Sequence, residues 1–232
     1  TVDWRRVAKR IADARAANRL AGGSLPHGHT FLTLCDIRGY EGLMFDMADG
    51  EPRLARLIEM VERFNLEIVR RYVALGADVI GYPEDLGMQV GPMLSPEHFR
   101  KYVKPVYQRM MAPARKAGCL VHMHSDGDIR TLAADLVEGG VDILNLQDLV
   151  NGIDWIAENF AGQVCIELDI DRQQITARGT PRRIDELIRE EVATLSSSRG
   201  GLLMIYGLYP GVPLRNVAAL MDAMERYARF HS

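Results

Sequence analysis

The chain has 232 residues, which is enough for one large domain with a complete hydrophobic core. Its hydrophobic content of 47% and charged content of 25% are ordinary for a globular protein, and its net charge of -3 gives no reason to expect a nucleic acid or an anionic membrane as a partner. No apolar run reaches the length of a membrane span. The three cysteines, Cys35, Cys119 and Cys165, are widely spaced and odd in number, which predicts a reducing, cytoplasmic location rather than a disulfide framework.

The first third of the chain predicts two helices around one strand. The expected elements are a helix from Asp3 to about Leu20, a loop over 21–29, a strand from Thr30 to Asp36 and a helix over 51–75. The long helix is ended by Gly76 at its C′ position. Its expected buried stripe consists of Leu54, Leu57, Ile58, Val61, Phe64 and Ile68.

The rest of the chain repeats the plan of a short apolar strand followed by a helix. The expected strands lie over 77–81, 118–126, 141–147, 163–169 and 201–206. The expected helices begin at Ser95-Pro96, near 129, near 153, at Thr180-Pro181 and at Pro213. Pro105 falls inside the first of these helices, so we expect a kink or a break there. The last helix is expected to bury Val217, Leu220, Met221 and Met224.

Short apolar strands that alternate with helices indicate parallel βαβ units, and no linker divides them. Six strands are compatible with an open doubly wound sheet, but no glycine-rich phosphate loop follows the first strand. The pattern therefore favours an α/β fold of the (β/α)8 TIM-barrel type with about six of the eight strands present. We expect residues 1–232 to form a single, partial barrel domain. Because the chain starts at Thr1 without a methionine, the two other strands are expected upstream.

The segment Gly118–Asp128 starts apolar and ends polar. Side chains alternate along a strand, so His122, His124 and Asp126 should point to one side. Active sites of TIM barrels lie at the C-terminal ends of the strands. Three ionisable groups on one face therefore predict a functional site, whereas the alternative is two core histidines followed by a helix-capping aspartate.

Polar side chains follow nearly every predicted strand, whereas the strand starts are apolar. We expect His124, Asp126 and Glu84 to be catalytic, and Glu84, His122, His124, Asp126 and Glu167 to open into one cavity. The expected substrate-binding residues are Asp36, Arg38, Tyr82, Asp85, Gln89, His122, Asn145, Gln147, Glu167, Asp169 and Tyr206. Asp171 belongs to the same ring of polar positions.

Metal binding is a second interpretation of the histidine strand. His122, His124 and Asp126 could bind zinc through nitrogen and oxygen ligands, with Glu84 or Glu167 as alternatives for the third. The other interpretation is that these groups hydrogen-bond a polar substrate. No tightly bound cofactor is otherwise expected.

Several motifs occur in one order along the chain. They are Gly76-Ala-Asp-Val-Ile-Gly-Tyr-Pro-Glu-Asp-Leu-Gly87, Leu94-Ser-Pro-Glu-His-Phe-Arg100, His124-Ser-Asp-Gly127, Gly140-Val-Asp-Ile-Leu-Asn-Leu-Gln147, Ile170-Asp-Arg-Gln173, Gly179-Thr-Pro181 and Tyr209-Pro-Gly-Val-Pro213. From about residue 30 to the end, this set resembles the uroporphyrinogen decarboxylase superfamily. The resemblance implies a (β/α)8 barrel. It also implies either decarboxylation without a cofactor or methyl exchange with a corrinoid protein.

The chain departs from both branches of that superfamily. Where the decarboxylases have a histidine after the last strand, this chain has Tyr206, and their tyrosine falls near Met44-Phe45 here. The thiol-directed methyltransferases bind zinc through His-x-Cys and a distant Cys, which correspond here to His124, Asp126 and Tyr206. What remains resembles members that are similar to corrinoid-linked methyltransferases or demethylases without the cysteine site.

Three functions follow as hypotheses. The first is methyl transfer between a small molecule and a corrinoid protein, with His124, Asp126 and Glu84 positioning or protonating the reactants. The second is decarboxylation of a polycarboxylate of the porphyrinogen type, for which Arg38 is the only obvious cation. The third is a non-catalytic barrel fragment or binding module. The oligomeric state does not follow from the sequence.

Overall fold

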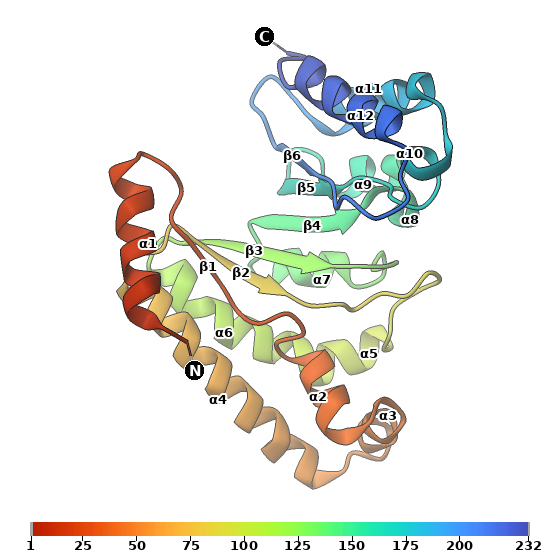
Figure 1. Cartoon of the computed structure of the whole chain (residues 1–232). Coiled ribbons are helices and arrows are strands. Elements are labelled where there is room, and N and C mark those ends of the chain that lie inside the picture. The colour runs from red at the N-terminus through yellow and green to blue at the C-terminus, as the bar shows by residue number, and fades with distance from the viewer. Residues whose placement is uncertain (1, 232) are drawn as a thin grey trace. The chain divides into compact units, whose positions relative to one another are not determined.

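The structure of the chain is a computed structural model that describes residues 2–231. It consists of two compact units, Thr1–Ile143 and Leu144–Ser232. Six strands alternate with helices in the described residues, which confirms the predicted α/β class (Figure 1). That residues 1–232 form a single domain stays a prediction.

The strands of the first unit run parallel and follow the order of the chain. They are β1 (Gly22–Ser24), β2 (Val79–Pro83) and β3 (Leu120–Ser125). In the register of β2 and β3, Gly81 lies opposite His122 and Pro83 lies opposite His124. The C-terminal ends of these strands therefore lie next to one another.

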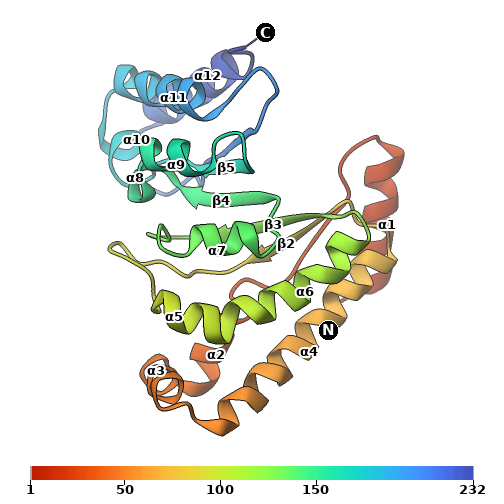
Figure 2. The ribbon, with the colours of Figure 1, turned by 180° about the vertical axis from the view of Figure 1, so that it is seen from behind.

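The helices of the first unit include two that pack side by side, α4 and α6 (Figure 2). Tyr82 of β2 donates a hydrogen bond to the carbonyl of Met110 in α6 (3.2 Å), so α6 lies on the face of the strand that buries Tyr82. The helices are α1 (Trp4–Ala16), α2 (Phe31–Arg38), α3 (Tyr40–Asp49), α4 (Pro52–Ala74), α5 (Pro96–His98), the π-helical turn η1 (Phe99–Val103), α6 (Lys104–Lys116) and α7 (Ala133–Glu138).

The second unit has the same parallel arrangement. Its strands are β4 (Ile143–Gln147), which starts at the unit boundary, β5 (Cys165–Asp169) and β6 (Leu202–Ile205), and β5 pairs in parallel with β6. Its helices are α8 (Asp148–Asn151), α9 (Ile153–Phe160), α10 (Ile175–Arg178), α11 (Pro181–Leu195) and α12 (Leu214–Tyr227). Helices α11 and α12 pack against each other over a core of Ile170, Ile184, Leu187, Ile188, Val192, Leu220 and Ala223.

The prediction of a strand from Thr30 to Asp36 is wrong, because these residues lie largely in α2. A short apolar run fits a strand or a buried helix turn equally well, and here a carboxylate from β2's C-terminal extension binds the first N–H groups of a helix. The first strand instead lies in the predicted loop, at Gly22–Ser24. A Cβ atom at Gly23 would lie 2.1 Å from the ring of Tyr72 in α4, so only glycine allows this approach.

Other local predictions are confirmed or corrected by the structure. Ser95 caps α5 through the backbone N–H of His98 (3.1 Å), and the break expected at Pro105 is the π-helical turn that precedes α6. Phe64 and Met221 are exposed rather than buried, and α1 ends at Ala16 rather than near Leu20. Within residues 2–231, no helix is long and apolar enough to cross a membrane.

Buried carboxyl groups gather in the second unit. Glu191 of α11 is fully buried, and Asp148 accepts a hydrogen bond from the backbone N–H of Asp171 (2.8 Å). Burial raises the pKa of Glu191 to about 10, and the neighbouring carboxyl groups of Asp148 and Asp171 add to the shift. Glu191 is therefore protonated at neutral pH in the folded protein.

We predict that Glu191 makes the protein less stable as the pH rises from about 5 to about 9. Between the ordinary pKa of a glutamate and the raised value, the unfolded chain releases the proton and the folded chain keeps it. The free energy of unfolding then falls by at most about 1.4 kcal/mol per pH unit from this group. Glu191→Gln should flatten that dependence in urea unfolding measured across this range.

Glu225→Gln, at an exposed position of α12, is the matched control and should keep the slope of the wild-type protein. Parallel stability curves for the wild-type protein and Glu191→Gln would show that Glu191 does not hold the proton.

Candidate functional site

The side chains at the end of β2 divide between two faces. Ile80, Tyr82 and Glu84 are fully buried on the helix-covered face, and Gly81, Pro83 and Asp85 alternate with them. Tyr82 was expected to bind substrate, but its hydroxyl is bound to α6, as described above. Two adjacent acids, Glu84 and Asp85, therefore have different environments.

Glu84 was expected at the mouth of the barrel, but its carboxylate is fully enclosed. Oε2 accepts hydrogen bonds from the backbone N–H groups of Thr30 (2.9 Å) and Phe31 (2.8 Å), and Oε1 accepts one from Leu32 (3.2 Å). Oε2 also accepts a hydrogen bond from the hydroxyl of Tyr107 in α6 (2.9 Å). The residue thus stabilises the N-terminus of α2, because that end of a helix carries unpaired N–H groups and a positive dipole.

Burial governs the electrostatics around Glu84. It raises the pKa of Glu84, while the four hydrogen bonds favour the charged form and oppose that shift. Burial also raises the pKa of Tyr107 well above its usual value, and the charge of Glu84 adds to this. The neighbouring His29 has its pKa lowered to about 3, mainly by burial, so its imidazole is neutral.

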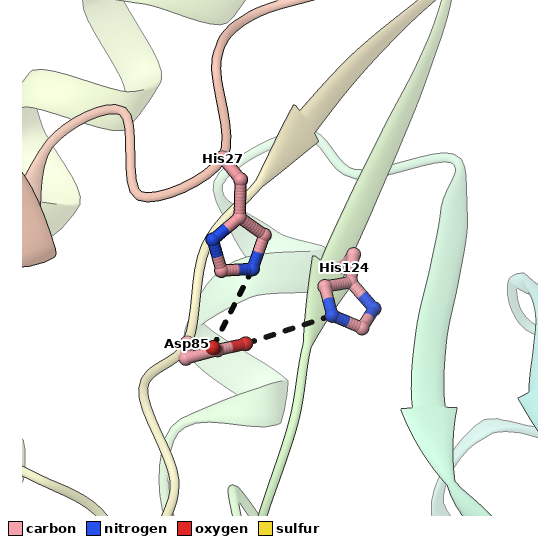
Figure 3. Close-up of side chains that lie close together, drawn as sticks. All are labelled: His27, Asp85 and His124. Atoms are coloured by element: carbon pink, nitrogen blue, oxygen red, sulfur yellow. Dashed lines mark ion pairs between the residues drawn. The ribbon is translucent and has the colours of Figure 1, made fainter. Parts of the chain in front are cut away.

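The clearest cluster of chemically active side chains consists of His27, Asp85 and His124 (Figure 3). Nε2 of His27 lies 3.4 Å from Oδ2 of Asp85, and Nε2 of His124 lies 3.5 Å from Oδ1 of the same carboxylate. The three ligand atoms lie within 4.8 Å of one another. Asp85 therefore stands between two imidazoles.

Backbone hydrogen bonds hold the segments that carry these three residues. The N–H groups of Leu25 and Gly28 donate to the carbonyls of Gly81 (2.9 Å) and Pro83 (3.0 Å), so the His27 loop continues along β2. The N–H of Glu84 donates to the carbonyl of His124 (3.0 Å). The strand ends therefore stay paired beyond the strands themselves.

Two glycines bring the Asp85 and Asp126 segments together. A Cβ atom at Gly127, whose φ is +82°, would lie 2.3 Å from the carbonyl carbon of Gly87. The backbone N–H of Asp126 donates to Oδ1 of Asp85 (3.1 Å). This close contact orients the carboxylate of Asp85 toward the two histidines.

The pKa of Asp85 lies below its ordinary value. Its partial burial works to raise the pKa, but hydrogen bonds from His124 and the Asp126 backbone, together with the nearby His27, outweigh that effect. Asp85 is therefore an ionised carboxylate at neutral pH, which can stabilise a positive charge on either imidazole or on a bound cation.

The other predicted site residues of the first unit lie partly near His124 and partly away from it. His122 and Asp126 lie on the less buried side of their segment with His124, as the alternation predicted, and Oδ1 of Asp126 is 3.8 Å from Nε2 of His124. Asp36 and Arg38 do not follow a strand, because they lie on the exposed part of α2. Arg38 pairs with Asp46 of α3 (2.6 Å), and Gln89 is exposed in the loop after Asp85.

The predicted residues of the second unit lie within its own strands or just after them. Asn145 is buried and donates to the backbone carbonyl of Glu167 (2.8 Å), whereas the backbone carbonyl of Gln147 accepts a hydrogen bond from Asn151 (2.8 Å). Asp169 pairs with Arg172 (3.0 Å). The hydroxyl of Tyr206 is 3.4 Å from that of Thr176, and Asp171 caps α10 through the N–H groups of Gln173, Gln174, Ile175 and Thr176.

The thiolate ligands that the resemblance implied for zinc do not fit the described residues. Cys35 lies in α2, and the buried Cys119 contacts the carbonyl of Ala77 (3.0 Å) at the start of β3. Cys165 is at the start of β5, so it does not occupy a strand end either. The nitrogen and oxygen donors of His27, Asp85 and His124 are the set that could hold a metal ion.

His27 was missed because the loop over 21–29 was not recognised as containing a strand. Once β1 is placed at Gly22–Ser24, His27 follows it by three residues. Asp85 follows β2 by two residues, and His124 is the penultimate residue of β3. The sequence feature that could have indicated His27 is Pro26-His-Gly-His29, in which two histidines flank a glycine.

We predict that Glu84→Ala lowers the free energy of unfolding by about 3 kcal/mol or more. The substitution leaves three backbone N–H groups and the Tyr107 hydroxyl without their acceptor in a buried place. Urea unfolding of the purified protein measures the change. Glu59→Ala, which removes an exposed partner of Arg56 in α4, is the control and should cost about 0.5 kcal/mol or less.

A stable Glu84→Ala protein that has lost its activity would instead make Glu84 a catalytic group. The two readings are therefore separated by measuring stability and turnover on the same preparation.

Comparison with known proteins places the chain in a family. The family described as uroporphyrinogen decarboxylase (URO-D) matches residues 28–227. A uroporphyrinogen decarboxylase from Thermus thermophilus is 28% identical over 185 residues, which are 77% of this chain and 50% of that protein. One from Geobacter sp. is 24% identical over 191 residues, or 79% of this chain and 52% of that protein. The chain thus spans about half the length of the curated relatives it matches.

A solved structure shares the fold. A methyltransferase from Methanosarcina mazei superposes with a TM-score of 0.69 at 19% sequence identity, covering 96% of this chain and 64% of that one. This likeness supports the predicted α/β fold of the TIM-barrel type, with six strands in residues 2–231. From the match over residues 28–227, the chain belongs to the uroporphyrinogen decarboxylase family.

Proposed function

We propose that this protein is a corrinoid-linked methyltransferase or demethylase that acts on a small molecule in the cytoplasm. The observation that carries the proposal is that Arg38 of α2 pairs with Asp46 of α3, whereas His27, Asp85 and His124 meet at the strand ends. Imidazoles beside a carboxylate suit proton transfer to or from a neutral heteroatom.

Charge argues against a polycarboxylate substrate at these strand ends. Such a substrate needs cationic groups for its acid side chains, and Arg38 was the cation that the sequence offered. Because Arg38 is bound to Asp46 through Nε and Nη2, at 2.6 and 3.1 Å, it is not aimed at the His27–Asp85–His124 cluster. Asp85 and Asp126 add negative charge beside His124.

The chemistry of methyl transfer assigns a role to this cluster. The corrinoid of a partner protein supplies the cobalt that takes up or releases the methyl group. When a methyl group leaves an ether, amine or thioether without its electron pair, the departing heteroatom keeps that pair and takes up a proton. His124 donates this proton, and Asp85 stabilises the imidazolium that precedes the donation; in the reverse direction His124 accepts the proton.

Two further observations support the proposal. The Methanosarcina mazei protein that shares this fold is a methyltransferase. The sequence also departs from the decarboxylases at Tyr206, where those enzymes have a histidine.

Decarboxylation is the second candidate, and the names of the curated relatives favour it. It would release carbon dioxide from a porphyrinogen-type polycarboxylate. Incubation of the protein with uroporphyrinogen and analysis of the porphyrins formed measures this reaction directly. Loss of carboxyl groups, without methylation of cobalamin in the assay below, would replace our proposal with this one.

We predict that His124→Ala abolishes methyl transfer while leaving the fold largely intact. His124 stands at the end of β3 beside Asp85, whereas His98 lies in the short helix α5 against the ring of Tyr102. Reduced cobalamin serves as methyl acceptor with a panel of methyl ethers, amines and thioethers, and its absorbance reports methylation. His98→Ala is the control and should retain both turnover and thermal midpoint.

If His124 served only packing, its loss should cost about 1–3 kcal/mol of stability and spare the activity per folded molecule. An active but less stable His124→Ala protein would therefore contradict the proposal.

A further inference from the structure

We infer that His27, Asp85 and His124 form a binding site for one divalent metal ion of the zinc class, with a coordination position left open for a substrate heteroatom. A role of the ion in methyl transfer rests on the proposed function. Binding of the ion to the protein does not. His27 lies one position before the segment matched by the family, and family membership does not assign it.

The spacing of the donor atoms suits a tetrahedral ion. Metal–ligand bonds of about 2.0–2.2 Å at tetrahedral angles place ligand atoms about 3.4 Å apart. Nε2 of His27 lies 3.4 Å from Oδ2 of Asp85 and Nε2 of His124 lies 3.5 Å from Oδ1, so each imidazole has this spacing to one of the two carboxylate oxygens. With one oxygen of Asp85 taken as ligand, all three ligand atoms lie within 4.8 Å of one another, and the exposed side chain of His27 has to move closer when an ion binds.

The chemistry of the donors narrows the kind of ion. Two imidazole nitrogens and one carboxylate oxygen suit zinc and similar divalent transition metals better than calcium or magnesium, which prefer oxygen ligands. Three protein ligands with a fourth position open is the arrangement of catalytic rather than structural zinc sites. This ligand set shares only His124 with the His-x-Cys and distant Cys pattern that the resemblance implied.

The surroundings support a cation at this place. Nε2 of His124 has two carboxylates nearby, Asp85 at 3.5 Å and Asp126 at 3.8 Å. The side chains of His27, Asp85 and His124 are 53%, 28% and 22% exposed, so an ion from solution can reach all three. Asp85 and His124 are buried enough for their side chains to be ordered, and both remain accessible to solvent.

The backbone already holds the ligands before an ion binds. The Asp126 N–H orients Oδ1 of Asp85, and the Gly87–Gly127 contact keeps the two segments close. The Gly28 N–H, bound to the Pro83 carbonyl, limits the movement of His27. Pre-ordered ligands lower the entropic cost of binding, which favours affinity.

The competing explanation is a hydrogen-bonded bridge in which Asp85 accepts from both imidazoles and no ion binds. Metal titration separates the two. The protein is treated with a chelator and dialysed, and Zn²⁺ is then added in a calorimeter, with no methyl donor, acceptor or corrinoid present. We expect one Zn²⁺ per chain. Co²⁺ added in place of zinc should give the intense visible absorption of a four-coordinate ion.

The variants identify the ligands. Removing a residue that only supports a metal ligand typically costs 10–100-fold in affinity, so His27→Ala and Asp85→Asn should each weaken Zn²⁺ binding by about 100-fold or more. His98→Ala is the matched control and should bind as the wild-type protein does. Far-ultraviolet circular dichroism on each variant shows that the fold is retained, as expected for the exposed His27.

The inference is overturned if the wild-type protein binds no stoichiometric Zn²⁺, or if His27→Ala binds it unchanged. It is also overturned if His122→Ala and Asp126→Asn lose the ion while His27→Ala keeps it, since the ligands would then be His122, His124 and Asp126. Stoichiometric zinc binding without methylation of cobalamin would leave the metal site standing and contradict the proposed function alone.

Discussion

The buried carboxylate of Glu84 is the interaction on which the first unit depends. It accepts hydrogen bonds from three backbone N–H groups at the start of α2 and from the hydroxyl of Tyr107 in α6. It therefore joins the end of β2 to two helices in a place that water does not reach. Because the loop that carries His27 runs directly into α2, the same carboxylate determines where that loop ends.

The alternation of side chains along β2 and its extension separates structure from chemistry over two adjacent residues. Glu84 points to the same buried face as Ile80 and Tyr82. Asp85 points to the opposite face, where it lies close to His27 and His124. A fully buried carboxylate bound by three N–H groups and a hydroxyl is closed to a substrate, but a partly exposed one between two imidazoles can accept a proton or bind a cation. The candidate site is therefore built from side chains at or just beyond three neighbouring strand ends.

Membership of the uroporphyrinogen decarboxylase family is compatible with two chemistries, and the charges at the strand ends bear on the choice between them. Decarboxylation of a polycarboxylate calls for cations, but Arg38 of α2 is bound to Asp46 of α3. A pair of imidazoles with an ionised aspartate suits a small substrate whose heteroatom gains or loses a proton. The same donors are spaced for a metal ion, so the proton chemistry and the proposed metal site concern one set of atoms.

The sequence by itself determined the α/β class, five of the six strands, most of the helices and the shared side of His122, His124 and Asp126, because hydrophobic periodicity and helix caps are local signals. Only the tertiary structure decided that the run after Thr30 is a helix, since the Glu84 carboxylate that receives its N–H groups lies more than fifty residues away in the chain. Tertiary structure likewise decided that Arg38 binds Asp46 and that His27 belongs with Asp85 and His124. The first pairing depends on how α2 and α3 are arranged, and the second on which strand ends lie side by side; no local pattern contains that information.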